Sequence, residues 1–245
     1  MLDKEEIQKH KLTSDGRPFY ESFIELPNGQ FFILFCSPDD LIRLANASRW
    51  YFDGTFKIQP TLFSQLFTVH TQEGNAIMPC AYALLSHKSY DLYVSFFMHL
   101  TNLARTFSGH FHLEEVTCDF ETGFLPAISQ AFGAHIRVKG CLFHHNQCIL
   151  RWVKNNGFQQ QYASKKSSVR QYIRKFLALP LLPLNLIRSA VQQLVAECLA
   201  SCPQLENFVT YFNSTWMVSI PPEKWCVHGE FVRTNNAVEG KTLLI

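Results

Sequence analysis

The sequence has 245 residues, 47% apolar and 14% aromatic, so it can build a substantial core, and an intrinsically disordered chain is excluded. The formal charge is only +2, and the longest apolar runs, residues 31–36 and 76–85, are far shorter than the roughly 20 residues of a membrane span. We therefore expect no membrane partner. Met1–Lys11 is charged and lacks the apolar region of a secretory signal, which predicts an intracellular protein with reduced cysteines.

The first predicted elements are a hairpin and a short helix. Tyr20–Glu25 and Phe31–Cys36 have the apolar and aromatic composition of strands, and a turn rich in helix and strand breakers separates them. Ser37 and Pro38 then supply an N-cap and a first-turn proline. We assign residues 1–48 to an N-terminal hairpin and helix.

Residues 49–158 predict a five-stranded mixed sheet covered by helices. Three consecutive strand-like runs favour antiparallel pairing, and two further strands follow helices that act as crossovers. This order is typical of the ribonuclease H-like α/β fold. The strands are expected at Trp50–Lys57, Ser64–Thr71, Ala76–Leu85, Glu115–Phe120 and His135–Gly140, and the helices near residues 89–108, 123–132 and 142–154.

The pattern changes after the sheet. Residues 159–224 consist of helical segments broken by Pro180, Pro183 and Pro203, which predicts an all-α insertion into the α/β domain. Residues 225–245 then form the last predicted segment.

Charge is unevenly distributed along the chain. Residues 122–196 contain no Asp or Glu but ten Lys or Arg residues. Such a surface attracts a polyanion, because each neutralised phosphate releases counterions. The alternative is a solvated helix face, since several of these residues have i, i+4 spacing. The candidate nucleic-acid contacts are Arg151, Lys154, Lys165, Lys166, Arg170, Arg174 and Lys175.

Two aspartates lie near the ends of predicted strands. Asp53 precedes Gly54 in the first core strand, and Asp119 lies at the end of the fourth. If these strands are neighbours, the two carboxylates come side by side and repel each other unless a cation lies between them. With a third acid, such a pair can hold two Mg²⁺ ions about 4 Å apart for phosphodiester chemistry. The structural alternative is a turn for Asp53 and a helix cap for Asp119.

Five short motifs resemble, in order and spacing, those of the Mutator-like element (MULE) transposase domain. They are Trp50–Lys57 (WYFDGTFK), Tyr82–Leu85 (YALL), Thr117–Glu121 (TCDFE), Lys139–His144 (KGCLFH) and Arg233–Gly240 (RTNNAVEG). The resemblance implies a ribonuclease H-like DDE domain in which Asp53, Asp119 and Glu239 hold two Mg²⁺ or Mn²⁺ ions. Asn236-x-x-Glu239 also fits a capping box, in which Glu239 serves only its own helix.

The resemblance includes a Cys-x-x-His element formed by Cys141 and His144. A Cys and a His at i, i+3 share one helix face, but a closed zinc site needs four ligands, and the neighbours on offer are only His145 and Cys148. We therefore expect a structural or DNA-contacting role for this element and no zinc.

The leading interpretation is a transposase catalytic domain that cleaves and transfers DNA strands. Its expected partners are double-stranded DNA at transposon ends and target, and further copies of itself, in the nucleus. The alternatives are a decayed or domesticated non-catalytic DNA-binding or interaction protein, and a stand-alone nuclease with the same metal site. Only six residues follow Glu239, so we expect residues 225–245 to carry a truncated catalytic helix and weak activity.

Overall fold

The structure is a computed structural model that describes residues 11–55, 62–74, 76–121 and 123–230. These residues form two compact units that meet at Val138 and Lys139. We call the described residues up to Val138 the sheet unit and those from Lys139 to Glu230 the helical unit.

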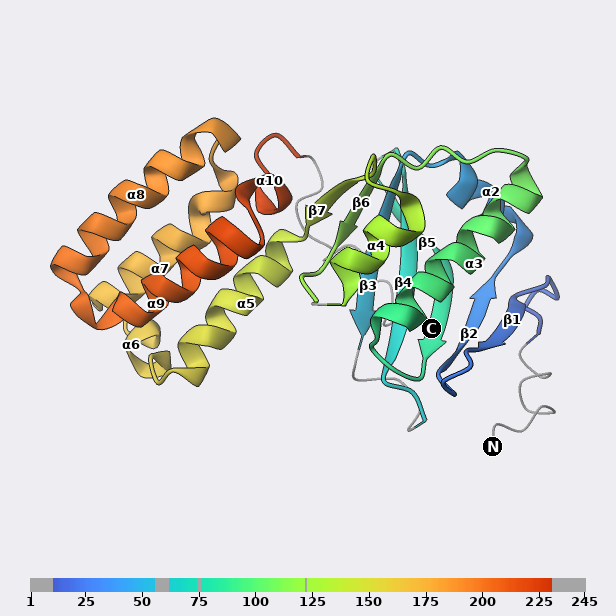
Figure 1. The fold of residues 1–245 in the computed structure, drawn as a ribbon, viewed down its shortest axis with the longest axis horizontal. Coiled ribbons are helices and arrows are strands. Elements are labelled where there is room, and N and C mark those ends of the chain that lie inside the picture. The colour runs from blue at the N-terminus through green and yellow to red at the C-terminus, as the bar shows by residue number, and fades with distance from the viewer. Residues whose placement is uncertain (1–10, 56–61, 75, 122, 231–245) are drawn as a thin grey trace. The chain divides into compact units, whose positions relative to one another are not determined.

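The sheet unit contains a mixed sheet of seven strands in the order β1-β2-β5-β4-β3-β6-β7 (Figure 1). The strands are β1 (Tyr20–Glu25), β2 (Phe31–Cys36), β3 (Arg49–Thr55), β4 (Gln65–Glu73), β5 (Ala76–Leu85), β6 (Glu115–Cys118) and β7 (Arg137–Gly140). The predicted antiparallel run is confirmed, because β4 pairs antiparallel with both β3 and β5. β6 pairs parallel with β3 after a helical crossover.

The predicted count of five strands is wrong, because the N-terminal hairpin belongs to the same sheet. β1 and β2 pair antiparallel, and β2 then pairs antiparallel with β5, with Phe32 opposite Leu85 and Cys36 opposite Ala81. An uncovered β5 edge would expose a row of unpaired backbone groups, and β2 satisfies them. The hairpin is thus an extension of the core sheet.

Three helices cover one face of this sheet: α2 (Pro38–Asn46), α3 (Tyr90–Ser108) and α4 (Phe124–Phe132). Ser37 and Ser89 cap α2 and α3 by accepting hydrogen bonds from backbone N–H groups, and Gly109 ends α3 with a left-handed φ of 76°. Trp50, Phe52 and Phe97 lie in the aromatic core between helices and sheet. Because side chains alternate along a strand, the residues next to Phe52 face the other side of the sheet.

The helical unit contains helices of very different lengths. They are α5 (Leu142–Asn155), α6 (Gln159–Ala163), α7 (Ser168–Ala178), η1 (Leu179–Leu181), α8 (Leu184–Ser201), η2 (Pro203–Leu205), α9 (Glu206–Phe212), the π-helix η3 (Asn213–Ser219) and α10 (Pro222–Trp225). Their shared core includes Phe176, Phe208 and Phe212, whose rings lie within 6.2 Å of one another. α5 lies in this unit, although residues 49–158 were expected to form one core.

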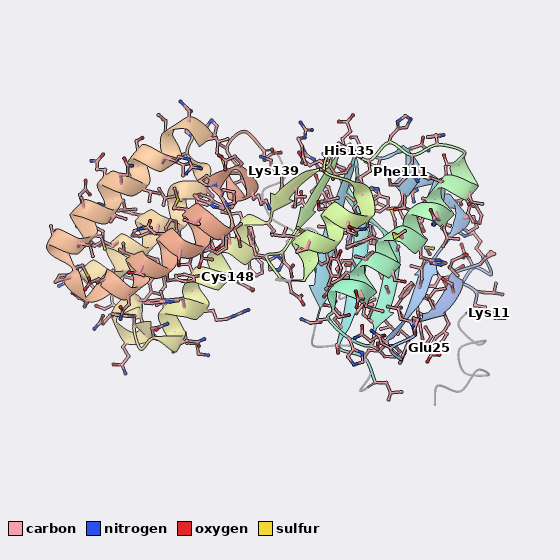
Figure 2. The ribbon with its side chains drawn as sticks, in the orientation of Figure 1. Lys11, Glu25, Phe111, His135, Lys139 and Cys148 are labelled. Carbon is pink, nitrogen blue, oxygen red and sulfur yellow. The ribbon has the colours of Figure 1, made fainter. Side chains whose placement is uncertain are left out.

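The two ends of the helical unit lie together. Lys139 (labelled in Figure 2) is its first residue, and the Nζ atom of Lys139 lies 3.9 Å from Oε1 of Glu230, the last residue described. Val227 N–H also donates to Pro180 O at 2.9 Å, which holds the last described residues against the rest of the unit.

No helix in the part of the chain that the structure describes is long and apolar enough to cross a membrane.

Candidate active site

The sheet topology brings the backbones of Asp53 and Asp119 to the same place. In the parallel β3–β6 pair, Trp50 lies opposite Val116 and Tyr51 opposite Thr117. Two residues further along each chain come Asp53 and Asp119. Neighbouring strands are about 4.8 Å apart, so we infer that these two residues follow the ladder as adjacent positions.

Neither aspartate has the local role that the structural alternatives offered. Asp53 and Gly54 both lie inside β3, opposite Thr68 and Phe67 of β4, and therefore do not form a turn. The N-cap position of α4 is Gly123, so Asp119 does not cap that helix. The two carboxylates need another explanation.

Asp53 is held from the β4 side by buried polar groups. Its side chain and backbone are almost fully enclosed, with 3% exposure. Thr68 Oγ1 donates a hydrogen bond to the Asp53 carbonyl oxygen at 3.2 Å, and His70 Nε2 lies 2.8 Å from the same hydroxyl. Because the Thr68 proton is used towards Asp53, His70 Nε2–H acts as the donor to Thr68. These two hydrogen bonds hold the Asp53 backbone in place and so restrict the position of its carboxylate.

Asp119 begins a short loop that also carries a second acid, Glu121. Asp119 Oδ1 accepts a hydrogen bond from the Glu121 backbone N–H at 3.2 Å. Burial raises the pKa of Asp119, and the Glu121 N–H and the Lys88 ammonium group act in the opposite direction. Burial and then the nearby Asp119 raise the pKa of Glu121. Both carboxylates are thus placed where negative charge is costly, which is the condition that a bound cation relieves.

Glu121 and its partners were missed by the sequence analysis. Tyr93 OH donates to Glu121 Oε1 at 3.1 Å, Gln65 Nε2 donates to Tyr93 OH at 2.8 Å, and Lys88 Nζ lies 3.6 Å from Glu121 Oε2. Only the Asp119-x-Glu121 spacing was visible in the sequence. Gln65 and Lys88 come from distant segments, and no local pattern marks them.

The remaining predicted residues are the third acid, Glu239, and the Cys-x-x-His element. Glu239 is outside the described residues. Cys141 is buried at the N-cap position of α5, where its side chain makes no capping bond, and His144 lies in the first turn of the same helix. Within residues 11–55, 62–74, 76–121 and 123–230, no three His, Cys, Asp or Glu side chains group as a metal site. A site with three protein ligands therefore needs a residue from the rest of the chain.

The basic residues predicted to bind nucleic acid belong to the helical unit and differ in their surroundings. Arg170 donates to the Tyr162 carbonyl at 2.8 Å and stacks over the Tyr162 ring, while Lys175 pairs with Glu197 at 3.2 Å. The other five predicted residues are all exposed, and we call them the exposed basic set: Arg151, Lys154, Lys165, Lys166 and Arg174. Residues 139–230 contain ten basic and four acidic residues, so this unit has a positive field.

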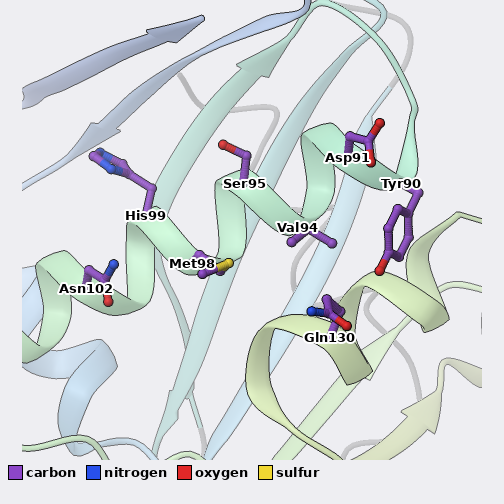
Figure 3. A pocket seen from close by; sticks show the side chains of 8 residues that line it. All are labelled: Tyr90, Asp91, Val94, Ser95, Met98, His99, Asn102 and Gln130. Atoms are coloured by element: carbon purple, nitrogen blue, oxygen red, sulfur yellow. The ribbon is translucent and has the colours of Figure 1, made fainter. Parts of the chain in front are cut away.

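The sheet unit also has a groove that lies apart from the candidate site. It has a volume of about 560 Å³ and lies on the outer side of α3, with Gln130 of α4 on its other side (Figure 3). Tyr90, Val94 and Met98 give it apolar walls. None of its lining residues is Asp53, Asp119 or Glu121, so it is separate from the candidate site.

Comparison with known families identifies the segment that carries these strands. Residues 49–148 match the family model described as the MULE transposase domain. The matched segment begins at β3 with Asp53, includes β6, Asp119 and β7, and ends inside α5. The chain has no match among curated proteins.

Proposed function

We propose that this chain, which carries a MULE transposase domain over residues 49–148, is the catalytic part of a transposase that cleaves and transfers DNA strands. The observation that carries the proposal is the parallel pairing of β3, which contains Asp53, with β6, which Asp119 directly follows. The fold proposed for it is the ribonuclease H-like one, extended by the N-terminal hairpin.

The donor set suits Mg²⁺ or Mn²⁺. Asp53, Asp119 and, from outside the described residues, Glu239 would supply carboxylate oxygens, which are the ligands that these hard cations prefer. Burial of Asp53 and Asp119 favours a cation beside them. Two such ions activate an attacking water or 3′ hydroxyl and stabilise the leaving oxygen when bound. The protein's own part is to hold the carboxylates in place, through Thr68 for Asp53 and through the Glu121 N–H for Asp119.

The helical unit is proposed to hold the DNA. Phosphate contacts from the exposed basic set would position the duplex without selecting its sequence. Assembly of further copies on the DNA and action in the nucleus belong to the same proposal.

Titration of the full chain with Mn²⁺ in a calorimeter tests the metal site. Wild type is expected to take up Mn²⁺, and Asp53→Asn and Asp119→Asn to lose most of the uptake. Glu114→Gln is a matched control, because Glu114 is exposed near the start of β6 and outside the proposed site. Equal uptake by all four proteins would contradict the proposal.

One observation favours a second candidate function, a decayed or domesticated protein that binds DNA without cutting it. Among the residues that the structure describes, no three metal-ligating side chains come together. If Glu239 does not complete the set of metal ligands, the protein would keep its fold and its positively charged helical unit but could not cleave DNA. In that case the chain would bind duplex DNA, and neither Mn²⁺ nor any of the three substitutions would change a nicking rate already at background.

A further inference from the structure

Lys88 lies in the short link between β5 and α3, and its neighbours fix this link. Ser86 Oγ accepts a hydrogen bond from Phe31 N–H at 2.8 Å. Ser89 caps α3 by accepting from Leu92 N–H at 3.3 Å. The backbone is therefore held on both sides of Lys88, and the ammonium group changes position mainly by rotation of its own side chain.

The loop that follows β6 packs against the same end of α3. A Cβ atom placed on Gly123 would lie 3.5 Å from the backbone N of Tyr90, so the two segments run close to each other. Between them, Lys88 Nζ lies 3.6 Å from Glu121 Oε2. The positive charge of Lys88 also acts on Asp119, whose pKa it lowers against the larger effect of burial. The ammonium group thus lies beside Glu121, and its charge also reaches Asp119.

Glu121 is anchored so that it stays near Lys88. Its other oxygen accepts from Tyr93 OH, which in turn accepts from Gln65. Gln65 and Tyr93 are buried, with 1% and 0% exposure. Rotation of Glu121 away from Lys88 would break a hydrogen bond in this buried chain, which is costly. Lys88 is one-third exposed, with 34% of its side chain accessible, so it is the partner that can move towards solvent.

We propose that Lys88 is a positioning residue that acts as the internal counter-ion of Asp119 and Glu121, and that a divalent cation has to compete with its charge. Without metal, Lys88 stabilises the two carboxylates. When metal binds, the ammonium group moves outward, where a DNA phosphate is a suitable new partner. This inference rests on the proposed function, because it assumes that Asp119 binds the metal.

The test measures Mn²⁺ affinity of the full-length protein for Lys88→Met, with Lys88→Arg as the matched control that keeps the charge. Removal of a nearby positive charge should tighten Mn²⁺ binding about fivefold in Lys88→Met, while Lys88→Arg stays within about twofold of wild type. Lys88→Gln serves as a second neutral variant, and circular dichroism checks that each protein is folded. In a Glu121→Gln background the gain from Lys88→Met should shrink, because Glu121 no longer holds Lys88 near Asp119.

If Lys88 only forms a structural ion pair, its removal should leave the Mn²⁺ affinity unchanged or lower it. Unchanged or weaker Mn²⁺ binding in both neutral variants would overturn the inference. The Asp119→Asn protein separates this result from failure of the proposed function. Uptake that depends on Asp119 but not on Lys88 overturns this inference alone, whereas uptake that does not depend on Asp119 overturns both.

Discussion

The two units bury different chemistry and carry opposite charge. Of the ten buried polar side chains among the described residues, nine belong to the sheet unit, and His145 is the one in the helical unit. Residues 1–138 contain fifteen acidic and ten basic residues, whereas residues 139–230 contain four acidic and ten basic residues. The sheet unit encloses nine polar side chains in its low-dielectric interior, whereas the helical unit carries most of its charged side chains on the surface. Buried polar groups and excess positive charge thus belong to different parts of the sequence.

The largest expected effect is on catalysis by the sheet unit. Asp53→Asn and Asp119→Asn should each lower Mn²⁺-dependent nicking of supercoiled plasmid by about 1,000-fold or more, because charge stabilisation by metal ions supplies several kcal/mol. Affinity for duplex DNA, measured by fluorescence anisotropy in the absence of metal, should change less than twofold. A parallel loss of nicking and DNA affinity would show that the two units do not divide the work in this way.

The next effect concerns the aromatic core of the sheet unit. The Phe52 ring stacks on Phe97 at 5.0 Å and also contacts Phe124 at 5.6 Å. Phe52→Ala should lower the free energy of unfolding by about 3–5 kcal/mol in urea. The control is Phe23→Ala, since Phe23 is 40% exposed and should cost far less. Amide hydrogen exchange should show lost protection in β3 and β4 with α7 and α8 still protected. Equal loss in both would show that the units unfold as one.

A smaller effect is the pH dependence of the helical unit. His145 is fully buried between Trp216 and Trp225, with ring centroids at 4.4 and 5.3 Å. Burial lowers the pKa of His145 from 6.5 to about 4. The unfolded chain therefore binds the proton first, so the stabilisation is present above pH 6.5 and is lost as the pH falls towards 4. We expect about 3 kcal/mol of His145-linked stability to disappear over this range.

The His145→Phe variant provides the comparison, because it keeps the ring and removes the titration. Urea unfolding of wild type and variant at pH 7.5 and pH 4.5 isolates the contribution of His145 from that of the carboxylates. Identical pH dependence of the two proteins would assign the acid sensitivity to other groups.

The smallest expected effect is on DNA affinity. Replacement of the exposed basic set by Gln should weaken duplex binding at least about tenfold and flatten the slope of log affinity against log salt. Lys175→Gln is the matched control, because Glu197 already neutralises much of its charge. At saturating DNA the nicking rate should stay near that of wild type. An unchanged salt slope would return these residues to the role of a solvated helix face.

The sequence predicted local elements well because their causes are local. Ser37 marks the start of α2 through its own side chain, so α2 was predicted with its N-cap, and α3 was predicted close to its observed bounds. The order of strands also led to the prediction that the first and fourth core strands are neighbours, which the β3–β6 pairing confirms. The attachment of β2 to β5 was missed, because either edge of a predicted sheet can accept a hairpin and no residue in β2 specifies which.

The additional residues around Glu121 were missed for the same reason, because no local sequence pattern marks a contact between distant segments. Lys88 and Gln65 come close to Glu121 or its partner Tyr93 only in the folded chain, because α3 and β6 separate them from Glu121 in the sequence. The roles of Asp53, Asp119 and Glu239 in metal binding and of the basic residues in DNA binding stay predictions. Their residue types fit, but a carboxylate or ammonium group serves structure as well as function.

The meeting of Lys139 with Glu230 has a consequence for the history of this protein. A segment whose first and last residues meet through their side chains can grow, shrink or be replaced while its two ends keep their places. Duplication or loss of a helix between α5 and α10 would then need no compensating change in strand register. Changes in the helices can therefore accumulate without disturbing the pairing of β3 with β6.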